Sequence, residues 1–192
     1  MKKTIFLAAA LGSSLLAGAA MAQQAAAPQP EVKRIGDFAV RCYPVKSVAP
    51  CDIYEDRVSK ESNQRVVSFS LAYMPSGNRY ILAVSVPLGV SIQQGLVIAG
   101  SGYTSPALPF RRCDGGGCYV EYAVTKELVD QFAKLGSDVK IRVTPDNSQP
   151  FEFPFSFDGF TAAHDEMVAS NKAKAMSPEA LQAAQAAAPP AK

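Results

Sequence analysis

The residues whose type and spacing point most directly to chemistry are four cysteines, Cys42, Cys51, Cys113 and Cys118. They fall into two local pairs, and the second pair encloses a run of three glycines. Of the three connectivities open to four cysteines, the local one is favoured because each pair is already close along the chain. Zinc is the rival, but paired zinc ligands usually have about two to four residues between them, which the first pair violates, and a redox C-x-x-C is absent. We therefore expect disulfides between residues 42 and 51 and between residues 113 and 118.

The first 22 residues read as a secretory signal peptide. Lys2 and Lys3 form a basic start, a short apolar run covers residues 5–16, and residues 20–22 form a small-x-small cleavage site. The apolar run is too short to cross a bilayer core of about 30 Å as a stable helix. We expect cleavage after Ala22 and a periplasmic or secreted chain, a compartment that allows disulfides.

The rest of the chain is neutral. The whole sequence has 19 basic and 17 acidic residues, and Lys2 and Lys3 are the only charges in the signal peptide, so 19 − 2 leaves 17 of each sign. A chain without net charge has no global field that would attract nucleic acid. Residues 80–100 are apolar, but Pro87, Gly89 and two glutamines predict buried strands instead of a membrane span. We expect no nucleic-acid partner and no transmembrane segment in the mature chain.

Catalytic motifs are missing. His164 is the single histidine, and neither G-x-S-x-G nor H-E-x-x-H accompanies it. Asp165 and Glu166 are its neighbours, but adjacent helix residues do not share a face. We interpret His164 as a packing residue, and expect no catalytic residue, no metal site and no cofactor.

Hydrophobic periodicity between residues 31 and 170 predicts mainly strands. The expected strands cover residues 37–42, 65–73, 79–86, 88–99 (as one or two strands), 119–124, 139–143 and 151–157. A short helix is expected over residues 126–135, capped by Thr125 and ended by Gly136, and a second over residues 160–169. This pattern predicts one mainly β domain, an antiparallel immunoglobulin-like β-sandwich with one short internal helix and a C-terminal helix.

One of these strands carries an aromatic stripe. Phe151, Phe153, Phe155 and Phe157 alternate along it. Such a stripe can form a ligand platform, but period-two placement is also what a core-facing strand needs, and we favour the core. Pro154 lacks a donor N–H, so the strand is expected at a sheet edge or at a bulge.

Both ends beyond this domain are of low complexity. Residues 23–30 are rich in Gln, Ala and Pro and are expected to form a flexible leader. Residues 171–192 are expected to form a disordered Ala/Gln/Pro-rich tail, although Ser177 and Pro178 resemble a helix start. A tether to the envelope or to a partner is the functional alternative for this tail.

An ordered set of motifs resembles the invasion-associated locus B family of bacterial envelope proteins. The set comprises the Gly-Asp-x-x-Val-x-Cys opening at residues 36–42, the PLGV strand at 86–90, Gly95, the Pro-Phe and Cys-Asp-Gly-Gly-Gly-Cys elements at 108–118, and the Gly-Phe-x-x-Ala helix at 159–163. The resemblance covers about residues 35–168, which is essentially the whole predicted domain. Two positions depart from the family pattern: Phe38 stands where members usually carry Trp, and a family-typical acidic residue is replaced near Ala99.

The resemblance implies a secreted or periplasmic β-sandwich. The family is linked in some intracellular pathogens to entry into host cells, but it also occurs in harmless relatives, so a role in invasion does not follow from the resemblance. Envelope maintenance and host-cell invasion both stay open. It supplies no catalytic residue that could be assigned to this chain. Phe can fill much of the core site of a Trp, so the fold is expected to survive the change at Phe38.

These observations predict a non-enzymatic interaction domain that binds a protein partner in the cell envelope or on a host cell. Five residues in or beside the cysteine pairs are the candidate contacts, because Tyr and Arg are enriched at binding hot spots: Tyr43, Tyr54, Arg111, Arg112 and Tyr119. The alternative for these segments is that the disulfides only stiffen the domain.

A small periplasmic hydrolase or carbohydrate-active enzyme is the alternative function. It would use carboxylates such as Asp52, Glu55, Asp56 or Asp114. Two of them would have to face each other across a cleft at about 5–10 Å.

Overall fold

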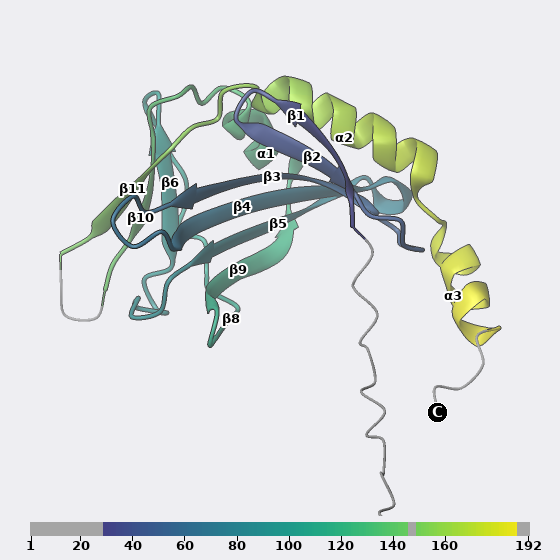
Figure 1. Cartoon of the computed structure of the whole chain (residues 1–192), viewed down its shortest axis with the longest axis horizontal. Coiled ribbons are helices and arrows are strands. Elements are labelled where there is room, and N and C mark those ends of the chain that lie inside the picture. Colours follow the sequence, from purple (N-terminus) through teal and green to yellow (C-terminus); the bar gives the residue numbers. More distant parts are fainter. Residues whose placement is uncertain (1–28, 146–148, 188–192) are drawn as a thin grey trace, which may run out of the picture.

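The computed structural model describes residues 29–145 and 149–187. The expected signal peptide at residues 1–22, most of the expected leader and the last five residues lie outside these ranges. Within them the chain forms two antiparallel β-sheets and three α-helices, as shown in Figure 1. The two-sheet, mainly β architecture predicted from the sequence is therefore confirmed.

The large sheet has the strand order β1-β2-β3-β4-β5-β9-β8, and the small sheet has the order β11-β10-β6-β7. The strands of the large sheet are β1 (Glu31–Ile35), β2 (Phe38–Cys42), β3 (Cys51–Val58), β4 (Arg65–Met74), β5 (Arg79–Val86), β8 (Arg112–Asp114) and β9 (Gly117–Val124). Those of the small sheet are β6 (Leu96–Gly100), β7 (Tyr103–Thr104), β10 (Val139–Val143) and β11 (Phe151–Phe155). The first five strands follow one another as a meander, since each pairs with the next along the chain.

Alternation along β4 explains why the large sheet has one apolar face. Val67, Phe69 and Leu71 are fully buried, while the residues between them stay partly exposed. A short 3-10 turn, η1 (Pro75–Gly77), connects β4 to β5, and Asn78 takes the left-handed conformation that lets the chain reverse. The hairpin expected over residues 65–86 is confirmed.

The small sheet contains the aromatic stripe at its edge. β11 pairs only with β10, so Pro154 lies in an edge strand, where its missing N–H breaks no ladder. Phe153, Phe155 and Phe157 are buried, in agreement with the core interpretation. Phe151 departs from it, because 54% of its surface is exposed and its ring packs edge-to-face on Phe153.

Phenylalanine rings fill the space between the two sheets. Phe38 is fully buried where the family usually has Trp, and its ring contacts Phe69, Phe157 and Phe160 at centroid distances of 5.5–6.0 Å. Phe69 and Phe157 meet edge-to-face at 5.2 Å. Such edge-to-face pairs are favoured over flat stacking because each ring directs its positive edge at a negative face. The expectation that Phe fills the Trp site is consistent with this packing.

The first helix is shorter than the sequence predicts. α1 (Lys126–Phe132) begins where Thr125 accepts a hydrogen bond from Leu128 N, as expected, but it ends at Phe132 instead of Leu135. Leu135 is nevertheless buried, since a turn after the helix directs it into the core. The predicted C-terminal end of this helix was wrong, because Leu135 is buried by the turn that follows the helix and not by a further helical turn.

The second helix extends past the predicted domain boundary. α2 (Phe160–Lys174) packs on β1–β4 with Phe160, Ala163, Met167 and Asn171 buried, a spacing that keeps these four side chains on one helix face. Asn171 is fully buried, so the prediction that the domain ends at residue 170 and that a disordered tail follows needs correction. A third helix, α3 (Pro178–Ala186), begins at the expected Ser177 cap and buries no side chain.

Candidate interaction surface

Both expected disulfides are present, and both join directly opposite residues of neighbouring antiparallel strands. Cys42 on β2 pairs with Cys51 on β3, with a Cα–Cα distance of 4.1 Å. Cys113 on β8 pairs with Cys118 on β9 at 4.0 Å. The disulfides therefore lie between strands, and most of the residues beside them are strand residues instead of the loop residues that the sequence predicted.

Strand alternation separates the cysteines from their neighbours. Cys42, Cys51 and Cys118 are buried against the core, so Arg41, Asp52 and Tyr119 point to the opposite side of the large sheet. We call this side the outer face: it carries residues 41, 52, 54, 56, 68, 70, 72, 81, 83, 85, 112, 114, 119, 121 and 123. Figure 1 shows β3, β4, β5 and β9 with no helix in front of them.

The first group on the outer face, the β2–β3 cluster, comprises Arg41, Tyr43, Asp52, Tyr54 and Ser70. The Arg41 guanidinium lies 3.7 Å from the ring centre of Tyr54 and 5.7 Å from that of Tyr43. Its Nε donates to Asp52 at 2.9 Å, and Ser70 donates to the same carboxylate at 2.7 Å. Burial works against the charge of Arg41, but the hydrogen bond and attraction of Asp52 outweigh it and raise the pKa of Arg41.

The second group, the β8–β9 cluster, comprises Arg112, Asp114, Tyr119 and Glu121. The Arg112 guanidinium lies 3.9 Å from the centre of the Tyr119 ring, and it donates to Glu121 and to Asp114. The Gly116 N–H donates to Asp114 at 2.8 Å and, with Tyr119 and Arg112, lowers the pKa of that carboxyl. This cluster thus repeats the design of the first: an Arg over a Tyr, held by carboxylates.

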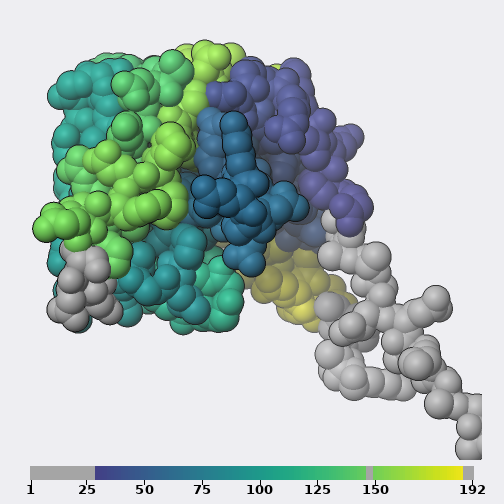
Figure 2. Space-filling view, turned by 60° about the vertical axis from the view of Figure 1, so that its left-hand side comes forward, coloured from purple at the N-terminus to yellow at the C-terminus, as the bar shows by residue number. Residues whose placement is uncertain are grey.

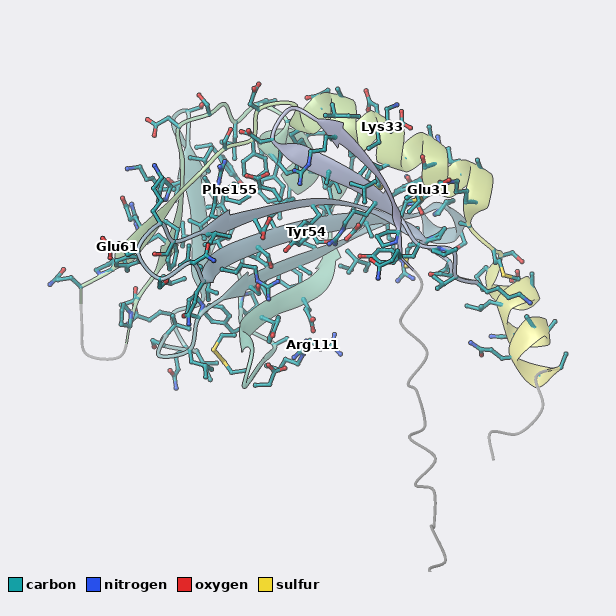
Figure 3. The ribbon with its side chains drawn as sticks, in the orientation of Figure 1. Glu31, Lys33, Tyr54, Glu61, Arg111 and Phe155 are labelled. Atoms are coloured by element: carbon teal, nitrogen blue, oxygen red, sulfur yellow. A yellow bond between two sulfur atoms is a disulfide. The ribbon has the colours of Figure 1, made fainter. Side chains whose placement is uncertain are left out.

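Four of the five predicted contact residues fall into these clusters, and one does not. Tyr43 and Tyr54 flank Arg41, and Arg112 stacks on Tyr119, whereas Arg111 lies just before β8 and donates its backbone N–H to Tyr119 O. Figure 3 shows Tyr54 over the large sheet and Arg111 below β9, at the lower edge of the folded domain. Strands β4 and β5 separate the two clusters.

Small side chains fill the outer face between the clusters. Ser68 and Ser85 share a hydrogen bond of 2.6 Å, and Ser70, Ala72 and Ala83 remain partly exposed, so no other element covers them. The clusters therefore stand at the two sides of a shallow, uncharged strip. Such a strip lets another molecule approach the sheet closely while both Arg–Tyr stacks stay within reach.

Sequence reasoning missed Arg41 as a site residue, and it considered Asp52 only as an enzyme carboxylate. A signal was present, since the Arg-Cys dipeptide occurs twice, at residues 41–42 and 112–113. In a strand, the residue before a buried cysteine must point to the opposite face. Each Arg is therefore placed on the outer face by the disulfide beside it.

A separate ion pair lies on the core side of the same sheet. Glu55 is 6% exposed, and Arg57 Nη2 lies 2.8 Å from its carboxylate and 3.7 Å from Asp37. Burial raises the pKa of Glu55 to about 7, and the attraction of Arg57 only partly opposes this. Arg57 also lies over Phe155 at 5.6 Å. Figure 2 shows the blue β3–β4 segment between the green second sheet and the purple first strands, which are the parts that carry Phe155 and Asp37, the other two contacts of Arg57.

The carboxylates of the hydrolase alternative do not face one another. Asp52 and Asp56 share the outer face but lie four positions apart along β3, which is about 13 Å of extended strand. Glu55 points to the core side, and Asp114 lies in β8 at the edge of the sheet, separated from β3 by β4, β5 and β9. The structure therefore offers no support for the pair of carboxylates that this alternative needs.

His164 packs against Tyr80 and Phe160 as the sequence predicts, but its Nδ1 also lies 3.1 Å from Asp165 Oδ1, so the expectation that these adjacent side chains do not meet is wrong. Its Nε2 lies 3.0 Å from the hydroxyl of Tyr80, and its ring stacks on Phe160 at 6.1 Å. In the described residues, no three His, Cys, Asp or Glu side chains gather as a metal site would require.

Comparison with known proteins identifies the family. The model of the Invasion associated locus B (IalB) protein family matches residues 39–168, which is most of the described domain. The chain belongs to this family. Two Invasion protein B homologs, from Brucella abortus strain 2308 and from Brucella abortus biovar 1 strain 9-941, are each 29% identical over 139 residues, covering 71% of this chain and 78% of theirs.

A solved structure of the family shares the fold. The crystal structure of invasion associated protein b from Bartonella henselae superposes with a TM-score of 0.62 at 17% identity, covering 74% of this chain and 99% of that chain. The disulfides and the IalB relatives together indicate an extracytoplasmic protein. Among the described helices, none has the length and apolar character needed to cross a membrane.

Proposed function

We propose that this IalB protein is a non-enzymatic extracytoplasmic domain that binds a partner protein through its outer face. The observation that carries the proposal is the pair of Arg-over-Tyr stacks, at 3.7 and 3.9 Å, which stand on one uncovered sheet face. Arg and Tyr side chains dominate protein-binding hot spots because they combine large contact area with directed hydrogen bonds. The relatives are named for invasion, which makes the host-cell surface one place to look for the partner, and the extracytoplasmic location makes the envelope another.

Rigidity supports this role. Both Arg side chains are held by carboxylates, and each stands next to a cross-strand disulfide. A contact surface that is ordered before binding loses less conformational entropy on association, so more of the contact energy becomes affinity. The carboxylates leave the β2–β3 cluster without net charge and the β8–β9 cluster with one negative charge, so neither cluster presents a strong positive field. This favours a partner that is recognised by shape and aromatic contact.

Export after Ala22 is part of the proposal. Lys2, Lys3 and the apolar run that follows would direct the chain across the inner membrane, where both disulfides can form. Mass spectrometry of the protein purified from its own cells should find Gln23 at the N-terminus. Recovery of a form that keeps Met1 or Lys2 in the membrane fraction would contradict this step.

Capture from envelope extracts tests the binding role. The oxidised chain from Gln23 onward serves as bait, together with the variants Tyr54→Ala and Tyr119→Ala. Phe151→Ala is the matched control, because Phe151 is an exposed aromatic residue outside the outer face. We expect each Tyr variant to lose the captured partner at unchanged melting temperature while the control retains it. Equal capture by all four proteins would refute the role of the outer face.

A further inference from the structure

Half of strand β9 has an unpaired edge. β5 pairs with β9 from Cys118 to Val124, but β8 pairs only with the first three residues, up to Tyr119. Successive residues of an antiparallel strand direct their backbone groups to opposite sides. Tyr119 O accepts a hydrogen bond on the β8 side, so the N–H and C=O groups of Glu121 and Ala123 also point to that side. No residue in the described ranges pairs with these groups.

A hollow of about 370 Å³ lies beside this edge, and we call it the β9 groove. The end of β9, the segment at residues 106–108 and helix α1 form its walls. Tyr122 and Leu128 line it, and Ala123 is exposed at its rim. A hollow of this size is at the lower end of the range for ligand pockets and suits a few side chains. The groove thus combines unpaired backbone groups with a place for apolar side chains.

The charge of the β9 groove is negative. Glu127 is its charged lining residue, and hydrogen bonds from its own N–H and from Thr125 lower the pKa of its carboxyl, which stays ionised. Lys126 does not offset this charge, because it is paired with Asp130 at 2.7 Å. Burial raises the pKa of Tyr122, so its phenol remains a neutral donor. A ligand with a cationic group next to an apolar stretch complements this lining.

We propose that an extended peptide segment, apolar in the middle and cationic at its end, adds to the large sheet along β9 at Glu121 and Ala123. In strand addition the main-chain hydrogen bonds supply affinity, and a side-chain pocket supplies specificity. A second copy of this chain would fit less well, because two β9 grooves would bring Glu121 and Glu127 of both copies together. The site uses the backbone edge of β9, including the backbone of Glu121, whose side chain belongs to the β8–β9 cluster and bonds Arg112.

A titration with a synthetic peptide tests this proposal. The probe is a capped seven-residue peptide of alternating Val and Thr with a Lys at each end, added to the oxidised chain from Gln23 onward and followed by amide exchange in NMR. We expect exchange at Glu121 and Ala123 to slow at least about tenfold, since both amides acquire partners. The same peptide N-methylated at alternate residues should give no protection, and a peptide with Glu ends should bind at least about tenfold more weakly.

Edge variants separate strand addition from nonspecific contact. Ala123→Pro removes an N–H that faces the open edge and leaves the ladder with β5 intact, whereas Ala123→Ser keeps the N–H. We expect the Pro variant to lose at least about tenfold in peptide affinity and the Ser variant to keep it. Leu128→Lys changes α1 and not the strand. It should lower the affinity for the Lys-ended peptide by a similar factor, because it places a positive charge in the β9 groove. Tyr54→Ala should leave peptide binding unchanged, so that the result does not depend on the function proposed for the outer face.

Two outcomes would overturn the proposal. One is unchanged exchange at Glu121 and Ala123 at millimolar peptide. The other is protection of these amides that grows with protein concentration in the absence of peptide, which would identify a second copy as the occupant.

Discussion

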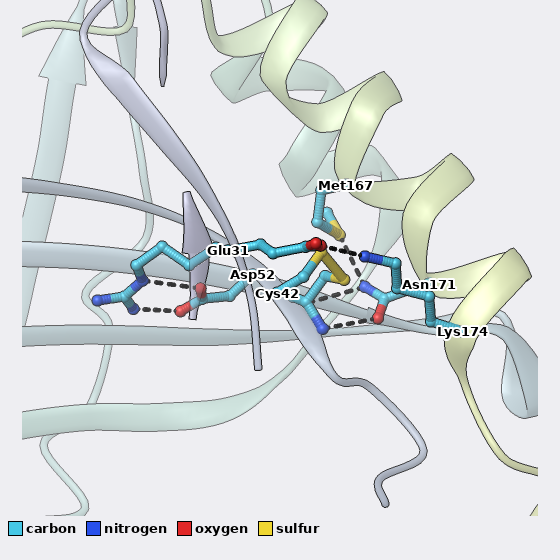
Figure 4. The surroundings of a disulfide bond; sticks show 8 residues. Glu31, Cys42, Asp52, Met167, Asn171 and Lys174 are labelled. Carbon is cyan, nitrogen blue, oxygen red and sulfur yellow. Dashed lines mark hydrogen bonds and ion pairs between the residues drawn. A yellow bond between two sulfur atoms is a disulfide. The ribbon is translucent and has the colours of Figure 1, made fainter. Parts of the chain in front are cut away.

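Asn171 of α2 bonds both backbone groups of Cys51 in β3. Its Oδ1 accepts from Cys51 N at 2.9 Å, and its Nδ2 donates to Cys51 O at 2.8 Å, as Figure 4 shows. The side-chain amide thus satisfies the backbone N–H and C=O of Cys51 in the way that a residue of a neighbouring strand would. Cys51 is also the residue of β3 that forms the disulfide. This contact fixes the end of α2 on the large sheet, on the core side of the strand whose other side carries Asp52.

Replacing Asn171 by Ala should lower the free energy of unfolding by about 2–4 kcal/mol, because it leaves a buried N–H and a buried C=O without partners. Chemical denaturation of the oxidised protein measures this. Lys172→Ala, an exposed neighbour on the same helix, is the control and should change stability by less than about 0.5 kcal/mol. Equal effects of the two substitutions would show that the amide contact contributes nothing.

Gly159 and Gly36 meet backbone to backbone, where the β1–β2 turn contacts the start of α2. A Cβ on Gly159 would lie 2.7 Å from Gly36 Cα, whereas Gly102 has a similar φ, +77° against +79°, with no atom near its Cβ position. We expect Gly159→Ala to lower the free energy of unfolding by at least about 2 kcal/mol more than Gly102→Ala does. Both substitutions place Ala in an unfavourable left-handed conformation, but only the first also brings its Cβ into a clash. Thermal unfolding of the two variants provides the comparison, and equal costs would refute the close contact.

The raised pKa of Glu55 makes stability depend on pH. Its carboxyl titrates at about 7 in the folded chain and near its ordinary value of 4.5 when unfolded. Between these pH values the folded state binds more protons than the unfolded state. The stabilisation that the Glu55 proton contributes is therefore fully present below about pH 4.5 and is lost as the pH rises toward 7. At about 1.4 kcal/mol per pKa unit, the loss amounts to roughly 3 kcal/mol.

Glu55→Gln should remove this part of the pH dependence. Denaturation curves at pH 4.5, 6 and 8 should show the variant gaining stability on the wild type as the pH rises. A constant difference between the two proteins over this range would mean that folding does not raise the pKa of Glu55.

The two disulfides should contribute unequally. In the chain-entropy model, closing such short loops stabilises by roughly 2–3 kcal/mol each. Removing Cys42 and Cys51 together should cost more than removing Cys113 and Cys118, because the first loop is longer and its two sulfurs are buried beside Met167 and Asn171. Denaturation of the two double-Ala variants tests the order, and the reverse order would contradict it.

Much of the fold followed from local patterns. The β4–β5 hairpin, the Thr125 cap, the edge position of Pro154 and both disulfides depend on residues that are near one another in sequence, so turn chemistry and alternation suffice to predict them. β1 was missed because four of its five residues are exposed and show no alternation. β3 was missed because its cysteine was interpreted as part of a loop.

The site was predictable only in part. Tyr and Arg beside the cysteines stay predicted partner contacts, and their grouping depends on strand register, which one sequence does not reveal. Arg41 meets Tyr54 because β2 and β3 pair in one register, and Asn171 reaches Cys51 across 120 residues of chain. Contacts of this range carry no periodic signal, which is why the tail boundary was also misplaced.

Photo-crosslinking from the outer face tests the central claim most directly. A photoreactive amino acid is placed at Ala83, between the two clusters, and as a control at Lys172, which is exposed on α2. In cells that export the protein, we predict a discrete adduct from position 83, which disappears when Arg112 and Tyr119 are both changed to Ala, and none from position 172. An adduct of the same mass and yield from both positions, or none from position 83, would contradict partner binding through the outer face.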